Sequence, residues 1–138
     1  MKTILIVLTK GDSIGGAQMY VIRLANFLKN THNVVVAYGL CDNDKIKPYL
    51  DELKITSLKI DGLKNSLNPI QILKGYLSLK KIIIEINPDI VSLNSSMIGI
   101  LGRLSCRVLK KKWVLTVHGW SFTNGIVWDK KYIYQTIE

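Results

Sequence analysis

The sequence has few cysteines and no long apolar run. Cys41 and Cys106 are its two cysteines, and their spacing matches neither a disulfide framework nor a CxxC metal site. This pattern indicates free thiols in a reducing compartment. Nowhere does the chain reach the roughly 18 consecutive apolar residues of a membrane-spanning helix. The apolar run from Ile4 to Leu8 is too short for a signal peptide, so we expect a soluble chain or one that rests on a membrane surface.

Acidic residues are also scarce, since ten Asp and Glu stand against nineteen Lys and Arg, for a net charge of +9. Such a surplus suits an anionic partner, although sixteen of the nineteen are Lys, a bias that an AT-rich genome produces without functional demand. A nucleic-acid partner is not expected, because basic platforms with interleaved aromatic residues are missing. Several basic residues are predicted to lie on two helices and could either contact an anionic membrane peripherally or form an ordinary solvated face. They are Arg103, Arg107 and residues 110–112, with Lys80 and Lys81.

With 138 residues, the chain has room for one domain. Apolar and β-branched runs alternate with segments of helical periodicity. The runs predict strands at 3–9, 33–40, 55–60, 89–94 and 113–117, and the periodic segments predict helices at 15–30, 42–53 and 69–86, a fourth that ends in the basic run 110–112, and a fifth from 129. This alternation predicts a Rossmann-like, doubly wound α/β domain, with a parallel sheet and helices on both faces.

The longest predicted helix opens at Pro69, a favoured residue in a first helical turn, and ends at Asn87 and Pro88. Its predicted face toward the core comprises Leu73, Tyr76, Leu77, Leu79, Lys80, Ile83 and Ile84. Lys74 and Lys81 are expected beside this face.

Ligands of doubly wound sheets bind beyond the carboxyl ends of the strands, where the strand order reverses. We expect the first, fourth and fifth strands around that point. The loops 10–16, 94–96 and 118–125 are therefore the candidate site loops.

The first of these loops reads GDSIGG and places Gly15 and Gly16 at a helix start. Free backbone amides and the helix dipole can hold a phosphate there, and the missing side chains allow close approach. The alternative is a tight strand-to-helix turn that simply needs glycine. The glycine spacing excludes the GxGxxG fingerprint, and a GxxxxGK[ST] loop is also absent. Both absences argue against an NAD enzyme and a P-loop NTPase.

His118 follows the fifth predicted strand directly, in the segment VLTVHGWSFTNG. An imidazole at this position can donate a hydrogen bond to a hydroxyl or phosphate oxygen, or transfer a proton, and it is the candidate catalytic residue. A structural hydrogen bond to a neighbouring loop is the alternative. Gly119 and Trp120 come next and belong to the predicted substrate-binding set. His32 lies in a turn and is assigned a structural role, and the two histidines do not form a zinc site.

Asn94, Ser95 and Ser96 end the fourth strand and open a helix, so one of them is expected to cap that helix. Their loop position also makes them candidate substrate-binding residues for a polyhydroxylated ligand. Trp120, Phe122 and Trp128 either line an acceptor cleft or pack the last helix.

These segments together resemble a known family. The run ILIVLT, then GGAQMYVIRLANFL and THNVVVA, resembles the start of GT-B glycosyltransferases of family 4. PDIVSLNSSMIGILGRL and KWVLTVHGWSFTNG are similar to the same family's fourth and fifth strands. The resemblance departs at Gln18, where Glu is frequent, at Thr31, where Gly is frequent, and at Asn94, where His is frequent.

The resemblance implies the N-terminal, acceptor-side domain of a two-domain enzyme that moves a sugar from a nucleotide-sugar donor to a carbohydrate or lipid-linked acceptor, with retention and without metal or cofactor. It places Gly15 and Gly16 near the donor diphosphate and His118 near the transferred sugar or the acceptor. The expected setting is surface polysaccharide synthesis in the cytoplasm, at the inner face of the membrane. The donor-binding domain is not contained in residues 1–138, so the chain alone is expected to show little or no transferase activity.

Two alternatives remain open at this point. One is a non-catalytic subunit of a split transferase. The other is a nucleotide-dependent Rossmann oxidoreductase in which Asp42, after the second strand, binds a ribose. An NAD-induced rise in melting temperature would favour the oxidoreductase.

Overall fold

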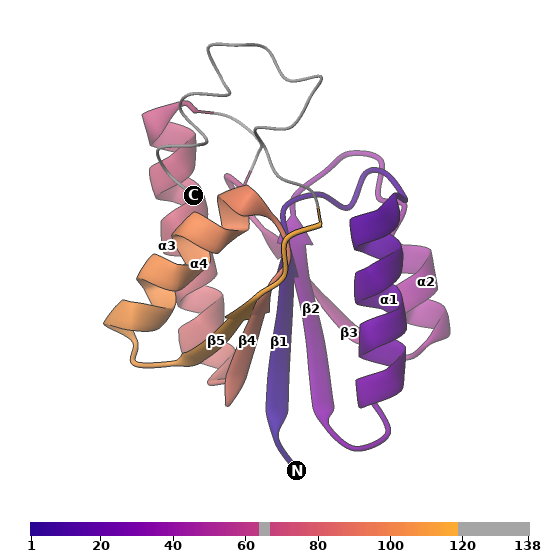
Figure 1. The fold of residues 1–138 in the computed structure, drawn as a ribbon. Helices are drawn as coiled ribbons and strands as arrows, with labels where there is room; N and C mark the ends of the chain where they lie inside the picture. The colour runs from indigo at the N-terminus through magenta and orange to yellow at the C-terminus, as the bar shows by residue number, and fades with distance from the viewer. Residues whose placement is uncertain (64–66, 119–138) are drawn as a thin grey trace.

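The computed structural model describes residues 1–63 and 67–118. In this part of the chain five parallel strands form one sheet in the order β3-β2-β1-β4-β5 (Figure 1). The strands are β1 Thr3–Leu8, β2 Asn33–Gly39, β3 Thr56–Ile60, β4 Ile90–Leu93 and β5 Lys112–Leu115, and the helices are α1 Gly16–Leu28, α2 Lys47–Glu52, α3 Pro69–Ile86 and α4 Ser96–Val108. The predicted Rossmann-like α/β class is confirmed.

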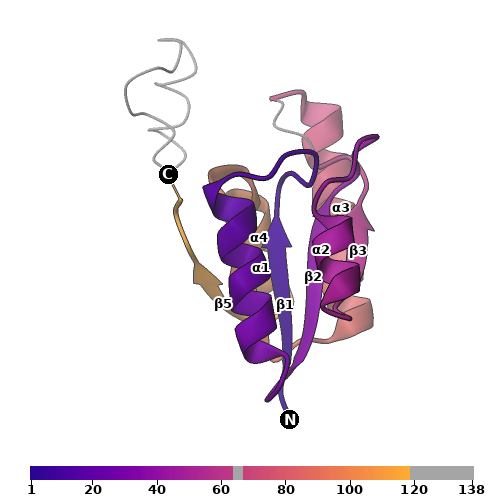
Figure 2. The same ribbon diagram turned by 90° about the vertical axis from the view of Figure 1, so that its right-hand side faces the viewer.

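Helices cover both faces of the sheet (Figure 2). Ile4, Ile6 and Leu8 of β1 pack in one core cluster with residues of α1 and α2, whereas Leu5 and Val7 pack in the other cluster with residues of α3 and α4. Because successive strand side chains point to opposite faces, a strand between two helical layers must be apolar throughout. The unbroken apolar run of β1 therefore reflects its central position.

The second helix is shorter than the predicted 42–53. Residues 42–46 form a loop, because the backbone amides of Lys45 and Ile46 donate to Gly11 O at 2.8 and 3.1 Å. Asp44 also accepts from the backbone amide of Lys47 at 3.1 Å. Hydrogen bonds to another loop thus replace the first helical turn.

The prediction that α4 ends in the basic run 110–112 is wrong. The helix stops at Val108, Lys110 takes a positive φ of 53°, and Lys112 is the first residue of β5. Arg107 is the basic residue in the last helical turn, where it is favourable for the dipole.

The predicted buried face of α3 is partly wrong. The structure buries Gly75, Leu79, Ile82 and Ile83, and it exposes Leu73, Leu77 and Ile84 by more than half. The apolar residues of α3 are distributed around most of its circumference, so periodicity alone did not distinguish the buried face from the exposed one.

In the described residues, no helix is both long and apolar enough to span a bilayer.

Candidate functional site

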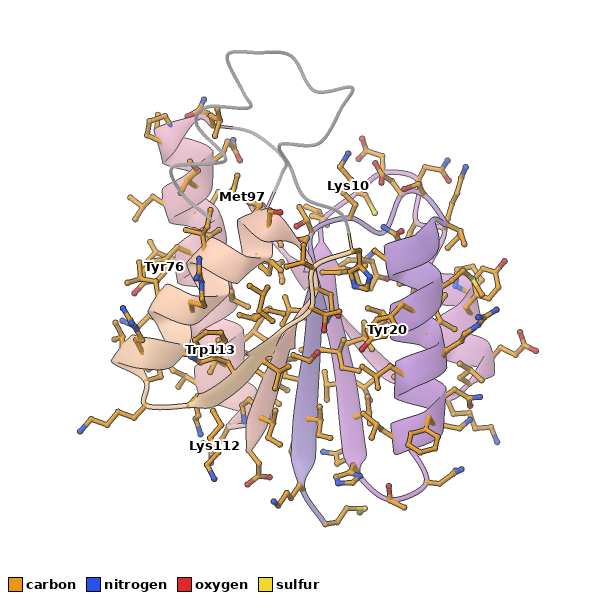
Figure 3. The ribbon with its side chains drawn as sticks, in the orientation of Figure 1. Lys10, Tyr20, Tyr76, Met97, Lys112 and Trp113 are labelled. Carbon is orange, nitrogen blue, oxygen red and sulfur yellow. The ribbon has the colours of Figure 1, made fainter. Side chains whose placement is uncertain are left out.

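The strand order reverses between β1 and β4, whose carboxyl ends lie side by side. Asn94 N donates to Val7 O at 2.9 Å. The hydroxyl groups of Thr9 and Ser95 form a hydrogen bond just beyond the two strands. Lys10 and Met97 lie at this edge of the sheet in Figure 3. The loops after β1 and β4 therefore meet as predicted for a doubly wound fold.

Gly15 and Gly16 open α1 at this edge, without a backbone conformation that requires glycine. Gly15 is extended, with φ −120° and ψ −167°. A Cβ at Gly16 would meet no other atom of the described structure within 4 Å, and one at Gly15 would meet only Gln18 Oε1, at 3.3 Å. Within the described residues neither conformation nor packing requires this glycine pair, and the space beside it is open.

The N-cap residue of α1 is Gly15, which has no side chain to cap the helix, and the first turn has no acidic residue in the chain as described. By contrast, Asn68 caps α3 through Ile70 N at 2.9 Å, and Ser95 caps α4 through Ile98 N at 3.4 Å. Uncompensated amides and the dipole make a helix N-terminus favourable for anions. The start of α1 therefore keeps this property.

Gln18, which departs from the family's frequent Glu, closes the loop before α1. Its Oε1 accepts from Gly15 N at 3.1 Å, and its Nε2 donates to Lys10 O at 3.2 Å. A carboxylate can accept but not donate, so Glu could not make the second bond. The side-chain amide of Gln18 therefore bonds to both ends of the loop between β1 and α1.

Ser95 is the residue that caps α4, which confirms the expected cap among residues 94–96. Its extended backbone (φ −179°, ψ 165°) and its hydroxyl form the N-cap, and Ser96 is the first helical residue. The presence of Ser95 at this position is therefore explained by its structural role as the N-cap.

Asn94 is 1% exposed, and its surroundings fix the orientation of its amide. Its Nδ2 donates to Val7 O at 3.3 Å, to Ser92 O at 3.1 Å and to Ser92 Oγ at 3.1 Å. The two carbonyl groups can only accept, so the nitrogen must face them. The Oδ1 atom is thereby turned toward His118.

His118 lies between β4 and α1. Its Nε2 is 3.4 Å from Asn94 Oδ1, and its ring packs edge-on against Tyr20 of α1, with 4.8 Å between ring centroids. Because Oδ1 can only accept, Nε2 carries the proton and Nδ1 is the acceptor of the neutral ring. Burial lowers the pKa of His118 from its ordinary 6.5, which favours this neutral form.

The structure brings His118, Asn94 and the first helical turns of α1 to the same sheet edge. Gly119 and Trp120, the remaining predicted substrate-binding residues, lie outside the described residues, as do Phe122, Trp128 and the helix predicted from 129.

A cavity of about 610 Å³ opens farther along this edge, beyond β1, β2 and β3. Its lining includes Lys10, Asp12, Asp42, Asp61, Gln71 and Lys74. Among the described residues, the predicted site residues do not line it. The loops after β2 and β3 were not among the predicted site loops, although Asp42 and Asp61 each follow a predicted strand. Asp42 was considered only as the ribose ligand of the oxidoreductase alternative.

Metal ligands are not clustered in the described part of the chain, where no group of three or more His, Cys, Asp or Glu residues is placed to hold an ion.

Comparison with known proteins adds independent findings. The family model described as glycosyl transferase 4-like matches residues 13–137. The chain is 30% identical over 98 residues to the Escherichia coli UDP-Gal:alpha-D-GlcNAc-diphosphoundecaprenol alpha-1,3-galactosyltransferase. This match covers 70% of the chain and 25% of the relative, so the chain spans about a quarter of that enzyme's length.

Solved structures share the fold. HepE from Anabaena, in complex with UDP and glucose, matches 99% of the chain with a TM-score of 0.74 at 14% identity. A glycosyltransferase from Rickettsia africae matches 99% with a TM-score of 0.69 at 26% identity. The chain covers 35% and 34% of these proteins. On the family match, which spans most of its length, this chain belongs to the glycosyl transferase 4-like family.

Proposed function

We propose that this chain is the acceptor-side domain of a glycosyltransferase that moves a sugar from a nucleotide-sugar donor to a carbohydrate or lipid-linked acceptor in surface polysaccharide synthesis. The observation that carries the proposal is the position of His118, bonded to Asn94 beyond β4 and packed on Tyr20 of α1. The proposal follows the family assignment, which favours a transferase over the oxidoreductase alternative.

The donor diphosphate approaches the N-terminus of α1. Open space over Gly16 permits close contact, and the first turn has no acidic residue and no cap from its N-cap residue, Gly15, in the described structure. Negative charge grows on a nucleoside diphosphate as it leaves, and preorganised positive dipoles stabilise that charge. The amides of α1 supply part of this stabilisation in the proposed enzyme.

His118 acts on a hydroxyl group near the reacting carbon. With its Nε2 proton directed to Asn94, the neutral ring offers Nδ1 as a hydrogen-bond acceptor. A hydroxyl of the acceptor donates to it, which orients that group. The pKa lowered by burial keeps this acceptor available near neutral pH.

The cavity beyond β1, β2 and β3 holds the acceptor. Its carboxylates and the Gln71 amide can bond sugar hydroxyls, and Lys10 and Lys74 can contact a phosphate. The Escherichia coli relative uses an acceptor with a sugar, a diphosphate and a polyprenol, and we assign the same chemical class to this cavity. For a lipid-linked acceptor of this class, we propose that the reaction takes place at the inner face of the cell membrane.

The proposed activity requires a second, donor-binding Rossmann-like domain. Basic groups that hold the leaving diphosphate are assigned to that domain. The 138-residue chain should therefore bind an acceptor without turning over a donor.

The test uses the 138-residue chain and a soluble GlcNAc-diphosphate-lipid analogue. We expect the analogue to bind, and to shift the ring resonances of His118 in NMR spectra. His118→Ala should weaken binding about tenfold, the loss of one or two good hydrogen bonds, whereas the turn variant His32→Ala should not. Robust turnover of UDP-sugars by the isolated chain, or unchanged affinity in His118→Ala, would contradict the proposal.

A further inference from the structure

The solvent side of α3 carries an apolar stripe. Ile70, Leu73, Leu77 and Ile84 are 75, 58, 54 and 57% exposed. They are separated by three, four and seven residues, the spacing of a single helix face. The buried residues Leu79 and Ile83 lie on the opposite side of the helix. The stripe therefore does not serve the core.

The neighbouring helix also exposes apolar residues. α3 and α4 lie together on one face of the sheet (Figure 1) and share one core cluster. Leu104 and Val108 of α4 are 51 and 53% exposed. We call the exposed residues of these two helices the α3–α4 face.

Positive charge is concentrated around this face. From Pro69 to Lys112 the chain has eight basic and two acidic residues. From Gly16 to Glu52, a stretch that includes α1 and α2 on the other face of the sheet, it has four basic and four acidic residues. In the described structure Lys74 pairs with Asp61 and Lys81 with Glu85, and the other basic side chains of the α3–α4 face have no carboxylate within 4.0 Å.

We propose that the α3–α4 face docks on an anionic phospholipid surface. Apolar side chains flanked by lysine and arginine are the composition of a helix that lies in the membrane interface, and basic residues near an anionic leaflet add binding energy. A second copy of this chain is the poorer occupant, because it would place two positively charged faces against each other.

The α3–α4 face lies close to the proposed acceptor cavity, as a domain that acts on a lipid-linked acceptor requires. Gln71 and Lys74, in the first turns of α3, line the cavity at the carboxyl edge. Docking through α3 would hold that cavity close to the lipid headgroups. The inference deepens the membrane location of the proposed function, but its test is separate, since vesicle binding requires neither donor nor acceptor.

The experiment is co-sedimentation of the 138-residue chain with two kinds of vesicle, phosphatidylcholine alone and phosphatidylcholine mixed with phosphatidylglycerol. We expect binding to the mixed vesicles that weakens with added salt. The double variant Leu73→Ser/Leu77→Ser should lose about tenfold or more of this affinity. Phe27→Ser is the matched control, because Phe27 is 78% exposed on α1, across the sheet.

A second pair of variants tests the charge. Lys80→Gln/Arg107→Gln should weaken binding to mixed vesicles about tenfold or more, whereas Lys2→Gln/Lys45→Gln should leave it nearly unchanged. Circular dichroism confirms folding in each case. Equal binding to both kinds of vesicle, equal losses in Phe27→Ser, or a dimer that Leu73→Ser/Leu77→Ser dissociates would each overturn the proposal.

Discussion

Asn94 Oδ1 accepts a hydrogen bond from His118 Nε2 at 3.4 Å, which joins the end of β4 to a residue just beyond β5. The bond depends on Nδ2 of the same amide, which donates to Val7 O and Ser92 O. The carbonyl groups of the sheet thereby determine which nitrogen of His118 is protonated.

The first prediction concerns this tautomer. Nitrogen-15 NMR of the neutral chain should show His118 protonated at Nε2. Asn94→Ala should remove that preference and lower the free energy of unfolding by about 1 to 3 kcal/mol, because Val7 O and Ser92 O lose a buried donor. Asn43→Ala, in the exposed loop after β2, should change neither property. Protonation at Nδ1 in the unaltered chain would refute the assignment.

The second prediction concerns pH. Burial lowers the pKa of His118 below 6.5, so the unfolded chain binds this proton more readily than the folded chain. Folding stability should therefore fall as the pH drops through 6.5 toward the lowered pKa, and should be free of this loss above 6.5. Tyr20→Ala exposes the ring and should raise the pKa of His118 toward its ordinary value. A proton NMR titration measures the pKa of His118 in both chains, and urea unfolding at several pH values measures the stability. An unchanged pKa in Tyr20→Ala would contradict the role of Tyr20.

The third prediction separates two glycines of one loop. A Cβ at Gly11 would lie 2.3 Å from Cδ2 of the buried Tyr38 ring, whereas one at Gly16 meets only open space. Gly11→Ala should therefore lower the free energy of unfolding by roughly 1 to 3 kcal/mol. Gly16→Ala should leave it unchanged or raise it by up to about 1 kcal/mol. Urea unfolding tests the pair, and similar losses in both variants would show that Gly16 is also needed for packing.

The fourth prediction concerns the cap of α4. Ser95→Ala removes the bond to Ile98 N and the contact with Thr9, and should lower the free energy of unfolding by about 1 kcal/mol. Ser13→Ala, in the exposed loop after β1, serves as the control for thermal unfolding. A melting temperature unchanged in Ser95→Ala would mean that another group caps the helix.

The fifth prediction concerns the thiols. Cys106 is fully buried and burial raises its pKa to about 11, whereas Cys41 is partly exposed. Because the thiolate is the reactive form, iodoacetamide should label Cys41 in the native chain and both residues after unfolding. Mass spectrometry after brief labelling distinguishes the sites. Rapid native labelling of Cys106 would indicate local opening of α4.

Local patterns in the sequence were sufficient for the class of fold. The apolar run of β1 and the Pro69 and Asn87 limits of α3 act within a few residues, so they could be recognised without the partner strands. Shorter elements were less predictable. The first turn predicted for α2 is replaced by bonds to Gly11 O, from a loop more than thirty residues earlier.

The sequence by itself determined the alternation of strands and helices, because side-chain periodicity and turn residues act over short distances. Only the tertiary structure decided which side of α3 faces the core, where the cavity opens, and that Asn94 and Tyr20 meet His118. Those outcomes depend on parallel crossovers that carry distant loops to one sheet edge, and no local pattern encodes the contacts formed there.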